Sequence, residues 1–336
     1  ATPYSATRDG YFNPFGSGSA NSQAVLDFIA QGYDWSQYRS RITSANLMLD
    51  GTVLTLPGGP LRLAVGAGFR REAFDRRRET FRSGLVPVLS VGDPQIREIA
   101  AVFAEARIPI IGPDNGVPLA QRLELTLAGR IEDYDDVGST SNPKVGVIWQ
   151  PSDPIKVRAS WSTSFRAPAL TEVFDRVVLG PLTVSDAGFS RIAILQTGGN
   201  PDLTPETAES FTVGVDIAPR PGLTFSAGYF NTRFKDKIGR PAIENITSIL
   251  VDPSLSPFVT RLTPGSSDDL ARVQAFLADP RFTSPTLYPA SAYSVILDGR
   301  WANTGALDVE GIDLSAGYDF QVGDHAFGLS GSASYL

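Results

Sequence analysis

Few side chains in this chain could do chemistry, and the first to consider is its single histidine. His325 stands beside a predicted turn at Gly323-Asp324. A histidine-based triad needs an imidazole next to both a nucleophile and a carboxylate, so none can form in the loops of this segment. The sequence has no cysteine, which excludes disulfides and thiolate metal sites. We therefore expect no enzyme, no catalytic residue and no cofactor.

A run of acidic residues could in principle bind a metal ion. Glu132, Asp133, Asp135 and Asp136 offer the oxygen ligands that Ca²⁺ prefers, but their spacing matches no calcium-loop pattern. A solvated turn explains the run better. We predict no metal site.

A cluster of arginines could bind phosphate groups, because guanidinium binds phosphate through two parallel hydrogen bonds. Lipopolysaccharide would be the partner. Glu72, Asp75 and Glu79 are interleaved with the arginines and favour a self-paired extension of a strand. The arginines are Arg70, Arg71, Arg76, Arg77 and Arg78.

Strands would position these polar groups, and the clearest strand pattern runs from Ile155 to Arg166. Side chains of a strand alternate between its faces, so a period of two over about a dozen residues indicates a strand with one apolar and one polar face. Soluble strands usually have about 5 or 6 residues, whereas a tilted strand needs about 9 to 11 to cross a bilayer. The sequence predicts a membrane strand with its apolar face toward lipid. The apolar face carries Ile155, Val157, Ala159, Trp161, Thr163 and Phe165, and the polar face carries Lys156, Arg158, Ser160, Ser162, Ser164 and Arg166.

Composition agrees with this interpretation. Hydrophobic residues make up 42% of the chain, and no apolar run approaches the roughly 18 residues of a membrane helix. The net charge of −7 argues against a nucleic-acid partner, which requires a basic surface.

The number of strands is predicted from the tight turns. In a barrel these turns lie on one side, so an even number of strands must separate the turn at Gly58 from the turn at Ser152. Three strands between them are clear, and residues 95–111, whose pattern also fits a helix, must supply the fourth. The three are residues 61–79, 119–134 and 142–150.

The remaining chain completes about ten antiparallel strands. A strand at residues 38–56 precedes the turn at Gly58, two strands flank the turn at 219–222, one long strand covers 292–320, and another begins at His325. The predicted long loops lie on the opposite side to the tight turns, as in outer-membrane barrels. They are residues 1–37, 80–94, 167–199 and 237–291, and the first of them contains a helix-like patch at 25–30.

Two further features of the pattern concern the loops and the strand ends. The segment SSDDLARVQAFLADP in the longest loop predicts a short capped helix, either a gating lid or, as we prefer, loop packing. Aromatic residues gather near strand ends, as an interfacial girdle demands. They include Trp149, Phe165, Tyr318 and Phe320.

Several motifs together resemble the TonB-dependent outer-membrane receptors. Their order and spacing over nearly the whole chain are specific, although each motif alone is weak. The motifs are FNPFG at 12–16, DYDDVGSTSNPKVGVIWQP from Asp133, FRAPALTEVF at 165–174, NPDLTPE at 200–206, and the spacing of Asn303, Gly305, Gly311 and Asp313.

The resemblance implies a 22-stranded barrel closed by an N-terminal plug and supplied with energy through the TonB protein. Neither the plug, nor the TonB-contact segment, nor the usual aromatic end of the last strand is recognisable here. We therefore interpret residues 1–336 as a partial β-barrel domain and expect an open, curved sheet that does not fold alone.

The resemblance also places ligand contacts in the loops and the upper lumen. Arg166, Tyr293, Arg300 and Trp301 would lie there. Pro201, Leu203, Pro205 and Glu206 are better explained as shaping the start of a strand.

The sequence thus predicts an all-β protein of the Gram-negative outer membrane. Its function would be TonB-coupled import of a scarce nutrient: an iron-siderophore complex, cobalamin or a carbohydrate. Its partners would be lipid and lipopolysaccharide, the TonB protein and the nutrient. A passive porin is the alternative, and a soluble all-β binding module is disfavoured by the strand length and the one-sided loops.

Overall fold

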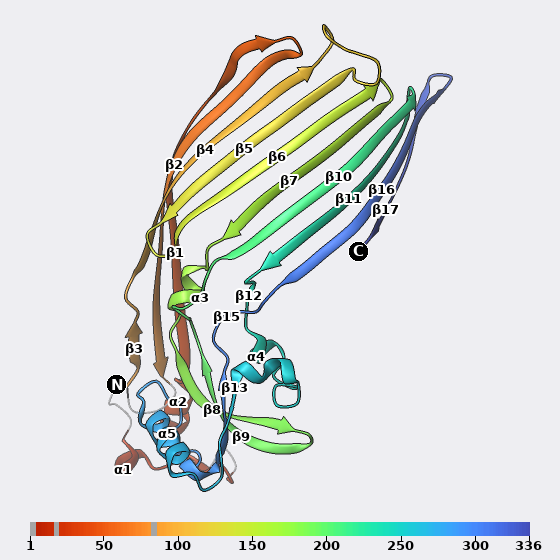
Figure 1. Ribbon diagram of the computed structural model, residues 1–336. Helices are drawn as coiled ribbons and strands as arrows, with labels where there is room; N and C mark the ends of the chain where they lie inside the picture. Colours follow the sequence, from red (N-terminus) through yellow and green to blue (C-terminus); the bar gives the residue numbers. More distant parts are fainter. Residues whose placement is uncertain (1–4, 17–19, 82–85) are drawn as a thin grey trace. The chain divides into compact units, whose positions relative to one another are not determined.

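The chain forms one large antiparallel sheet (Figure 1). The computed structural model describes residues 5–16, 20–81 and 86–336. Ten of the described strands follow the hydrogen-bonded order β1-β2-β4-β5-β6-β7-β10-β11-β16-β17, and β3 pairs with β2. The predicted count of about ten strands is confirmed. The strands are β1 (Tyr33–Leu56), β2 (Gly59–Phe81), β3 (Val88–Val91), β4 (Gln95–Ile111), β5 (Arg122–Tyr134), β6 (Gly138–Ser152), β7 (Ile155–Arg166), β10 (Glu206–Arg220), β11 (Leu223–Lys235), β16 (Leu307–Val322) and β17 (His325–Tyr335).

The first of two compact units contains the described residues up to 43 and those between 72 and 96. It holds α1 (Ala6–Asp9), α2 (Gln23–Ala30), β3 and parts of β1 and β2. Ser22 caps α2 by accepting a hydrogen bond from the Val25 amide. The predicted helical patch at 25–30 is confirmed, but the loops predicted at 1–37 and 80–94 also contain the start of β1 and all of β3. Parts of both loops, residues 1–4, 17–19 and 82–85, lie outside the described residues.

The second unit contains residues 44–71 and 97–336. Its strands alternate as predicted. In the register of β7 with β10, Val157 lies opposite Val215 and Ala159 opposite Val213, which gives an apolar face. The next pair, Ser160 and Thr212, lies on the polar face and is joined by a hydroxyl hydrogen bond of 2.8 Å.

Residues 95–111 form a strand, as the even count requires. β4 pairs with β5 from Ile99 opposite Tyr134 to Ile111 opposite Leu123. A helix here would use its backbone groups internally and would leave one edge of β5 unpaired. The need of β5 for a partner strand on each edge therefore favours a strand over a helix at residues 95–111.

The tight turns lie at one end of the second unit and most long connections lie at the other (Figure 1). Gly222 has a φ of 80° in the β10–β11 turn, and an added Cβ would lie 2.1 Å from the carbonyl oxygen of Asp319. Glycine is therefore required there. The short β5–β6 turn at 135–137 is the exception at the long-connection end.

The prediction of a single long strand at 292–320 is wrong. It is divided into β14 (Tyr293–Asp298), β15 (Ala302–Asn303) and β16. Gly299 and Gly305 interrupt it, and Gly305 has a φ of 96° that other residues rarely adopt. The predicted loops at 167–199 and 237–291 likewise contain helices and a second sheet.

The charged clusters are paired across strands. Arg78 forms an ion pair with Asp34 at 2.6 Å, so its partner lies on the neighbouring strand β1 and is not one of the interleaved acids Glu72, Asp75 and Glu79. In the acidic run, Asp136 lies 2.6 Å from Arg97, whose side chain is 2% exposed. Asp136 therefore compensates a buried charge and is more than part of a solvated turn.

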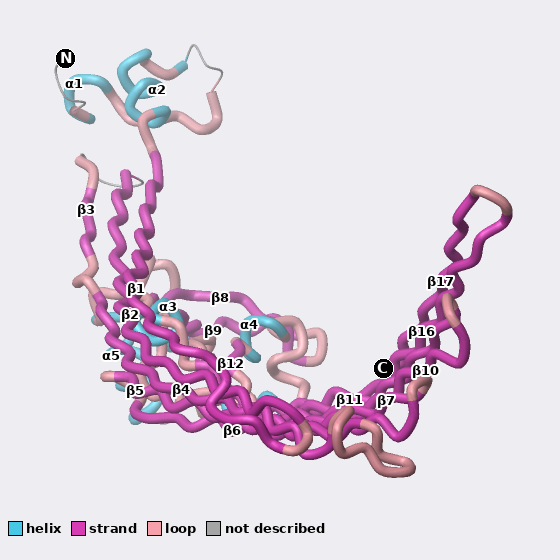
Figure 2. The backbone as a smooth tube through the Cα atoms, turned by 90° about the horizontal axis from the view of Figure 1, so that it is seen from above, coloured by secondary structure: helices cyan, strands magenta, loops and turns pink. Residues whose placement is uncertain are grey.

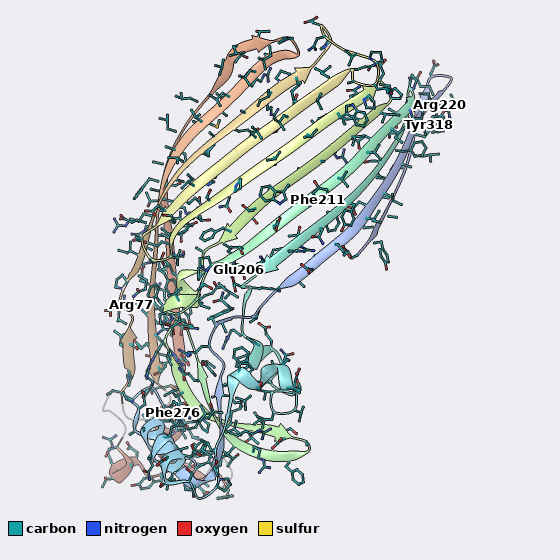
Figure 3. The ribbon with its side chains drawn as sticks, in the orientation of Figure 1. Arg77, Glu206, Phe211, Arg220, Phe276 and Tyr318 are labelled. Carbon is teal, nitrogen blue, oxygen red and sulfur yellow. The ribbon has the colours of Figure 1, made fainter. Side chains whose placement is uncertain are left out.

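The sheet is open. β1 and β17 are the two ends of its strand order, and no pairing joins them among the described residues. Figure 2 shows the curve of the second unit's strands from β4 through β6 to β17. Near the tight turns, Tyr318, Phe320 and Phe327 stack in series, and Arg220 covers the Tyr318 ring at 5.1 Å (Figure 3). This aromatic cluster agrees with the predicted girdle.

We expect Ala159→Arg to impair assembly of the full-length protein in the outer membrane and Ser160→Arg to leave it near normal. A charge on the lipid face costs about 2–4 kcal/mol near the membrane midplane, whereas the polar face already accepts arginine. Heat-modifiable mobility on gels would measure the folded fraction. Equal assembly of the two variants would contradict the assignment of faces.

Candidate functional site

The two longest connections fold together into one structure, which we call the loop module. It comprises residues 167–205 and 236–306 of the second unit. Its elements are α3 (Leu170–Phe174), β8 (Val178–Asp186), β9 (Phe189–Thr197), β12 (Ile238–Gly239), α4 (Pro241–Glu244), η2 (Pro253–Phe258), β13 (Val259–Arg261), α5 (Ser267–Ala278), η3 (Ala290–Ala292), β14 and β15.

A four-stranded sheet in the order β13-β14-β9-β8 joins the two connections. β9 and β14 are parallel, with Ile194 opposite Ile296 and Leu195 opposite Leu297. Both strands contain continuous apolar runs, which are typical of strands buried on both faces. These runs, at 192–195 and 295–297, are a sequence signal that a period of two does not detect.

Each face of this small sheet has its own core. Ala193, Val295 and Leu297 pack with Ile249 in one cluster. Ile194 and Ile296 pack in the other, together with Val273 of α5. The predicted helix is confirmed as α5, capped by Ser266, whose hydroxyl accepts from the Asp269 amide. Because α5 buries Val273 in this core, the structure favours the predicted role in loop packing over that of a gating lid.

Arg166 and two glutamates fasten the loop module to the large sheet. Glu206, the first residue of β10, lies opposite Arg166 in the register, and its carboxylate accepts hydrogen bonds of 2.7 and 3.0 Å from that guanidinium. Glu172 of α3 accepts from the same side chain at 3.1 Å. The carboxylate of Glu206 also accepts from the Ile238 amide at 2.6 Å, which ties in β12. Glu206 thus shapes the start of its strand, as predicted.

Two asparagines complete this junction. Asn303 accepts a hydrogen bond from the Thr204 amide at 2.9 Å and donates to the carbonyls of Thr204 and Asp236. Asn200 donates to the carbonyl of Trp301 at 2.8 Å. The motifs at 165–174, 200–206 and 303 therefore meet in one network, and their fixed spacing is the sequence signal for it.

Of the predicted ligand contacts, Arg300 and Trp301 are half-buried neighbours in the loop module. Arg300 donates to the Asp298 carboxylate at 2.7 and 3.0 Å. Burial opposes ionisation of Asp298, but the hydrogen bonds from Arg300 outweigh it and hold the pKa of Asp298 below its usual value. The guanidinium of Arg240 covers the Trp301 ring at 5.6 Å. Sequence reasoning did not single out Arg240.

The other two predicted contacts lie elsewhere. Arg166 belongs to the junction network. Tyr293 is 5% exposed in the α5 core, against Phe282 and Tyr288, and burial raises the pKa of its hydroxyl. The structure thus brings Arg300 and Trp301 together and places Tyr293 in the interior. Arg166 is linked to Trp301 through Glu172 and Asn200.

Across the described ranges, no group of three or more His, Cys, Asp or Glu side chains is arranged to hold a metal ion. Nor does any helix in those ranges have the length and apolar character needed to span a membrane.

The comparisons with known proteins agree with this architecture. The family profile "TonB dependent receptor-like, beta-barrel" matches residues 1–336. An iron-regulated outer membrane virulence protein of Vibrio cholerae is 36% identical over 125 residues, which are 37% of this chain and 17% of that protein. The chain thus spans only a small part of this curated relative.

Two solved structures show the same fold. The siderophore receptor PirA from Acinetobacter baumannii has a TM-score of 0.53 at 16% identity, over 89% of this chain and 37% of that one. A mutant ferric enterobactin receptor from Pseudomonas aeruginosa, in complex with enterobactin, has a TM-score of 0.54 at 17% identity, over 88% and 36%.

If the loop module is one body, cysteines at Ile194→Cys and Ile296→Cys should form a disulfide in the full-length protein. Directly paired strand residues have the short Cα separation that a disulfide needs, and the 336 residues contain no native cysteine. Non-reducing peptide mapping would detect the bond. The control pair Ala193→Cys and Ile296→Cys points to opposite faces and should stay reduced. Equal oxidation of the two pairs would contradict the register.

Asn303→Ala should loosen the junction, because it leaves the Thr204 amide and two carbonyls without their partner, at about 1–3 kcal/mol for each group left unsatisfied. Hydrogen exchange of residues 200–206 and 236–239 in the full-length protein should become faster. Asn142→Ala is the control, since Asn142 donates only one long hydrogen bond, of 3.3 Å, to Thr140. Unchanged exchange in Asn303→Ala would show that the asparagine clamp is dispensable.

Proposed function

The chain belongs to the TonB-dependent receptor-like β-barrel family, and from this premise we propose that it forms part of the wall of an outer-membrane receptor that imports an iron-siderophore complex. The family is one of Gram-negative outer-membrane receptors and not of enzymes. The family match over residues 1–336 is the observation that carries the proposal. It also removes the support for the passive-porin alternative.

Iron-siderophore import is favoured over cobalamin or carbohydrate by the relatives. The Vibrio cholerae protein is described as iron-regulated, and the two solved structures named above are a siderophore receptor and a ferric enterobactin receptor. In this proposal the apolar face of the sheet contacts lipid and lipopolysaccharide, and the polar face lines the lumen. Energy comes from the TonB protein, through parts of the receptor outside residues 1–336.

The loop module is the proposed point of ligand contact. Trp301, Arg240 and Arg300 combine an aromatic face with two guanidiniums, a combination that suits an anionic ligand with flat, unsaturated groups. Arg166 supports the site by holding Glu206 and Glu172 at the junction. Tyr293, the first residue of β14, supports it from the core that β14 shares with α5.

Uptake of radiolabelled nutrients by cells whose only receptor is the full-length protein would test this function, with the label on iron in the ferric siderophores, on cobalt in cobalamin and on carbon in maltodextrin. A panel of ferric siderophores, cobalamin and maltodextrin should show uptake of at least one ferric siderophore, dependent on TonB. Uptake that persists without TonB would support a porin, and uptake of cobalamin or maltodextrin alone would contradict the siderophore assignment.

Trp301→Ala should weaken binding of the imported ferric siderophore by about tenfold, because aromatic and cation–π contacts contribute about 1–2 kcal/mol when desolvated. Equilibrium binding to outer-membrane preparations would measure the change. Trp149→Ala, at the tight-turn end of β6, is the control and should bind normally. Equal affinities of the two variants would move the ligand contact away from Trp301.

A further inference from the structure

The apolar face of the large sheet is hollowed near its tight-turn end. The hollow has a volume of about 510 Å³ and spans β10, β11, β16 and β17. It lies where small side chains stand among large ones. Phe225 is opposite Ala316, which is opposite Gly331, and in the next row Ala227 is opposite Leu314. The hollow is therefore on the face that the proposed function turns toward lipid, and the inference below rests on that function.

An arginine stands on the same face, between the hollow and the turn. Arg220 ends β10 and lies opposite Leu223, which lies opposite Tyr318. Its guanidinium covers the Tyr318 ring at 5.1 Å (Figure 3). Leu223 and Tyr318 are each two residues from a residue that lines the hollow, Phe225 and Ala316, which is about 7 Å along a strand. One molecule can therefore reach both Arg220 and the hollow.

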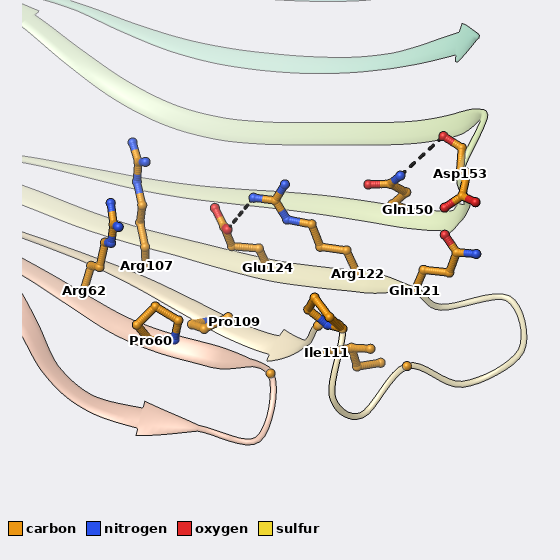
Figure 4. A pocket seen from close by; sticks show the side chains of 14 residues that line it. Pro60, Arg62, Arg107, Pro109, Ile111, Gln121, Arg122, Glu124, Gln150 and Asp153 are labelled. Carbon is orange, nitrogen blue, oxygen red and sulfur yellow. Dashed lines mark hydrogen bonds and ion pairs between the residues drawn. The ribbon is translucent and has the colours of Figure 1, made fainter. Parts of the chain in front are cut away.

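Arg220 differs from the arginines of the polar face, which have acids beside them. In the cavity that Figure 4 shows on the polar face at this end, Arg122 lies 2.8 Å from Glu124. Within the ranges that the structure describes, the Arg220 side chain has no ion pair and no hydrogen bond. Since Tyr318 contacts only the flat face of the guanidinium, the N–H groups in its plane are free to donate to an anion.

A glycerophospholipid carries both groups that this arrangement fits. Its phosphate can accept two parallel hydrogen bonds from a guanidinium, and its acyl chain can pack among the apolar side chains of the hollow. Lipid tails are about as apolar as these side chains, so the hollow alone would not select one lipid. The charge of Arg220 supplies the selectivity.

The position of Arg220 in the sheet indicates which leaflet supplies the lipid. Short turns of outer-membrane barrels lie on the periplasmic side, and the long loops lie outside. Arg220 and its aromatic neighbours are at the tight-turn end, at the level where interfacial aromatic residues meet headgroups. We propose that Arg220 and the hollow beside it form a binding site for one glycerophospholipid of the periplasmic leaflet.

Native mass spectrometry of the full-length receptor in detergent, titrated with phosphatidylglycerol, tests the charge contact. Arg220→Gln should raise the apparent Kd of the first bound lipid about tenfold, the effect of losing one charge-assisted hydrogen bond. Arg220→Lys should retain most of the affinity, because an ammonium also binds phosphate. Arg233→Gln is the matched control: it removes an arginine from the same face of β11, at the other end of that strand, and should leave the Kd unchanged. Equal Kd values for Arg220→Gln and the unmodified receptor would overturn the proposal.

Filling the hollow tests the acyl-chain contact. Ala316→Phe should weaken binding about fivefold, since the chain loses several dispersion contacts. Ala159→Phe enlarges an alanine on the same face outside the hollow and should bind normally. Heat-modifiable mobility on gels shows that each variant is folded. Unchanged affinity of Ala316→Phe would overturn the proposal.

The headgroup is tested with a second lipid. Diacylglycerol with the same acyl chains lacks the phosphate and should bind the unmodified receptor about tenfold more weakly than phosphatidylglycerol, for the same reason as Arg220→Gln. Equal binding of the two lipids would show that no phosphate is recognised and would overturn the proposal.

Iron uptake separates the failure of this site from the failure of the proposed function. A receptor that imports a ferric siderophore but binds phosphatidylglycerol equally well with and without Arg220 would retain its function and lose the lipid site. A receptor with the expected lipid affinities that imports no ferric siderophore would retain the lipid site and lose the import function.

Discussion

The structure depends on the need of every backbone N–H and C=O to find a partner where the surrounding hydrocarbon offers none. Long antiparallel ladders meet this need. β7 pairs with β10 over its whole length, from Ile155 opposite Ile217 to Arg166 opposite Glu206. The same requirement selects a strand for residues 95–111, since β5 needs a partner on that side. Alternation of apolar and polar faces follows from the ladder, because successive side chains must point to opposite sides.

The ladder also governs where charges can lie. On the polar face, most large charges are neutralised by a neighbour on the same or the adjacent strand, as Arg122 is by Glu124 and Arg158 by Asp216. At the end of β7 this pairing extends beyond the sheet, because Arg166 holds both Glu206 and Glu172. One ion-pair network thereby joins the strand to the loop module, and the asparagines at 200 and 303 extend it to Trp301 and Asp236. The motif residues at 165–174, 200–206 and 303 meet at this junction.

The two ends of the polar face therefore differ in chemistry. At the loop-module end Arg166 and Arg300 are paired with carboxylates, and the half-buried Trp301 ring lies beneath the guanidinium of Arg240. At the tight-turn end Arg62 lies beside Arg107 in the lining of one cavity, and among the described residues its side chain has no ion pair.

The sequence by itself determined the strands, their faces and the side of the tight turns, because a period of two and a turn residue are local signals. It also located the motif residues and the helix at 267–278. Tertiary structure decided what local signals do not encode. Residues 293–298 and 189–197 are about a hundred positions apart, and their apolar runs are parallel neighbours in a sheet whose two cores contain residues of both connections. That pairing divided the strand predicted at 292–320 and buried Tyr293, while Arg240 reached Trp301 through the folding of α4 and β15. Such contacts depend on where distant segments meet, which the residues of one segment do not specify.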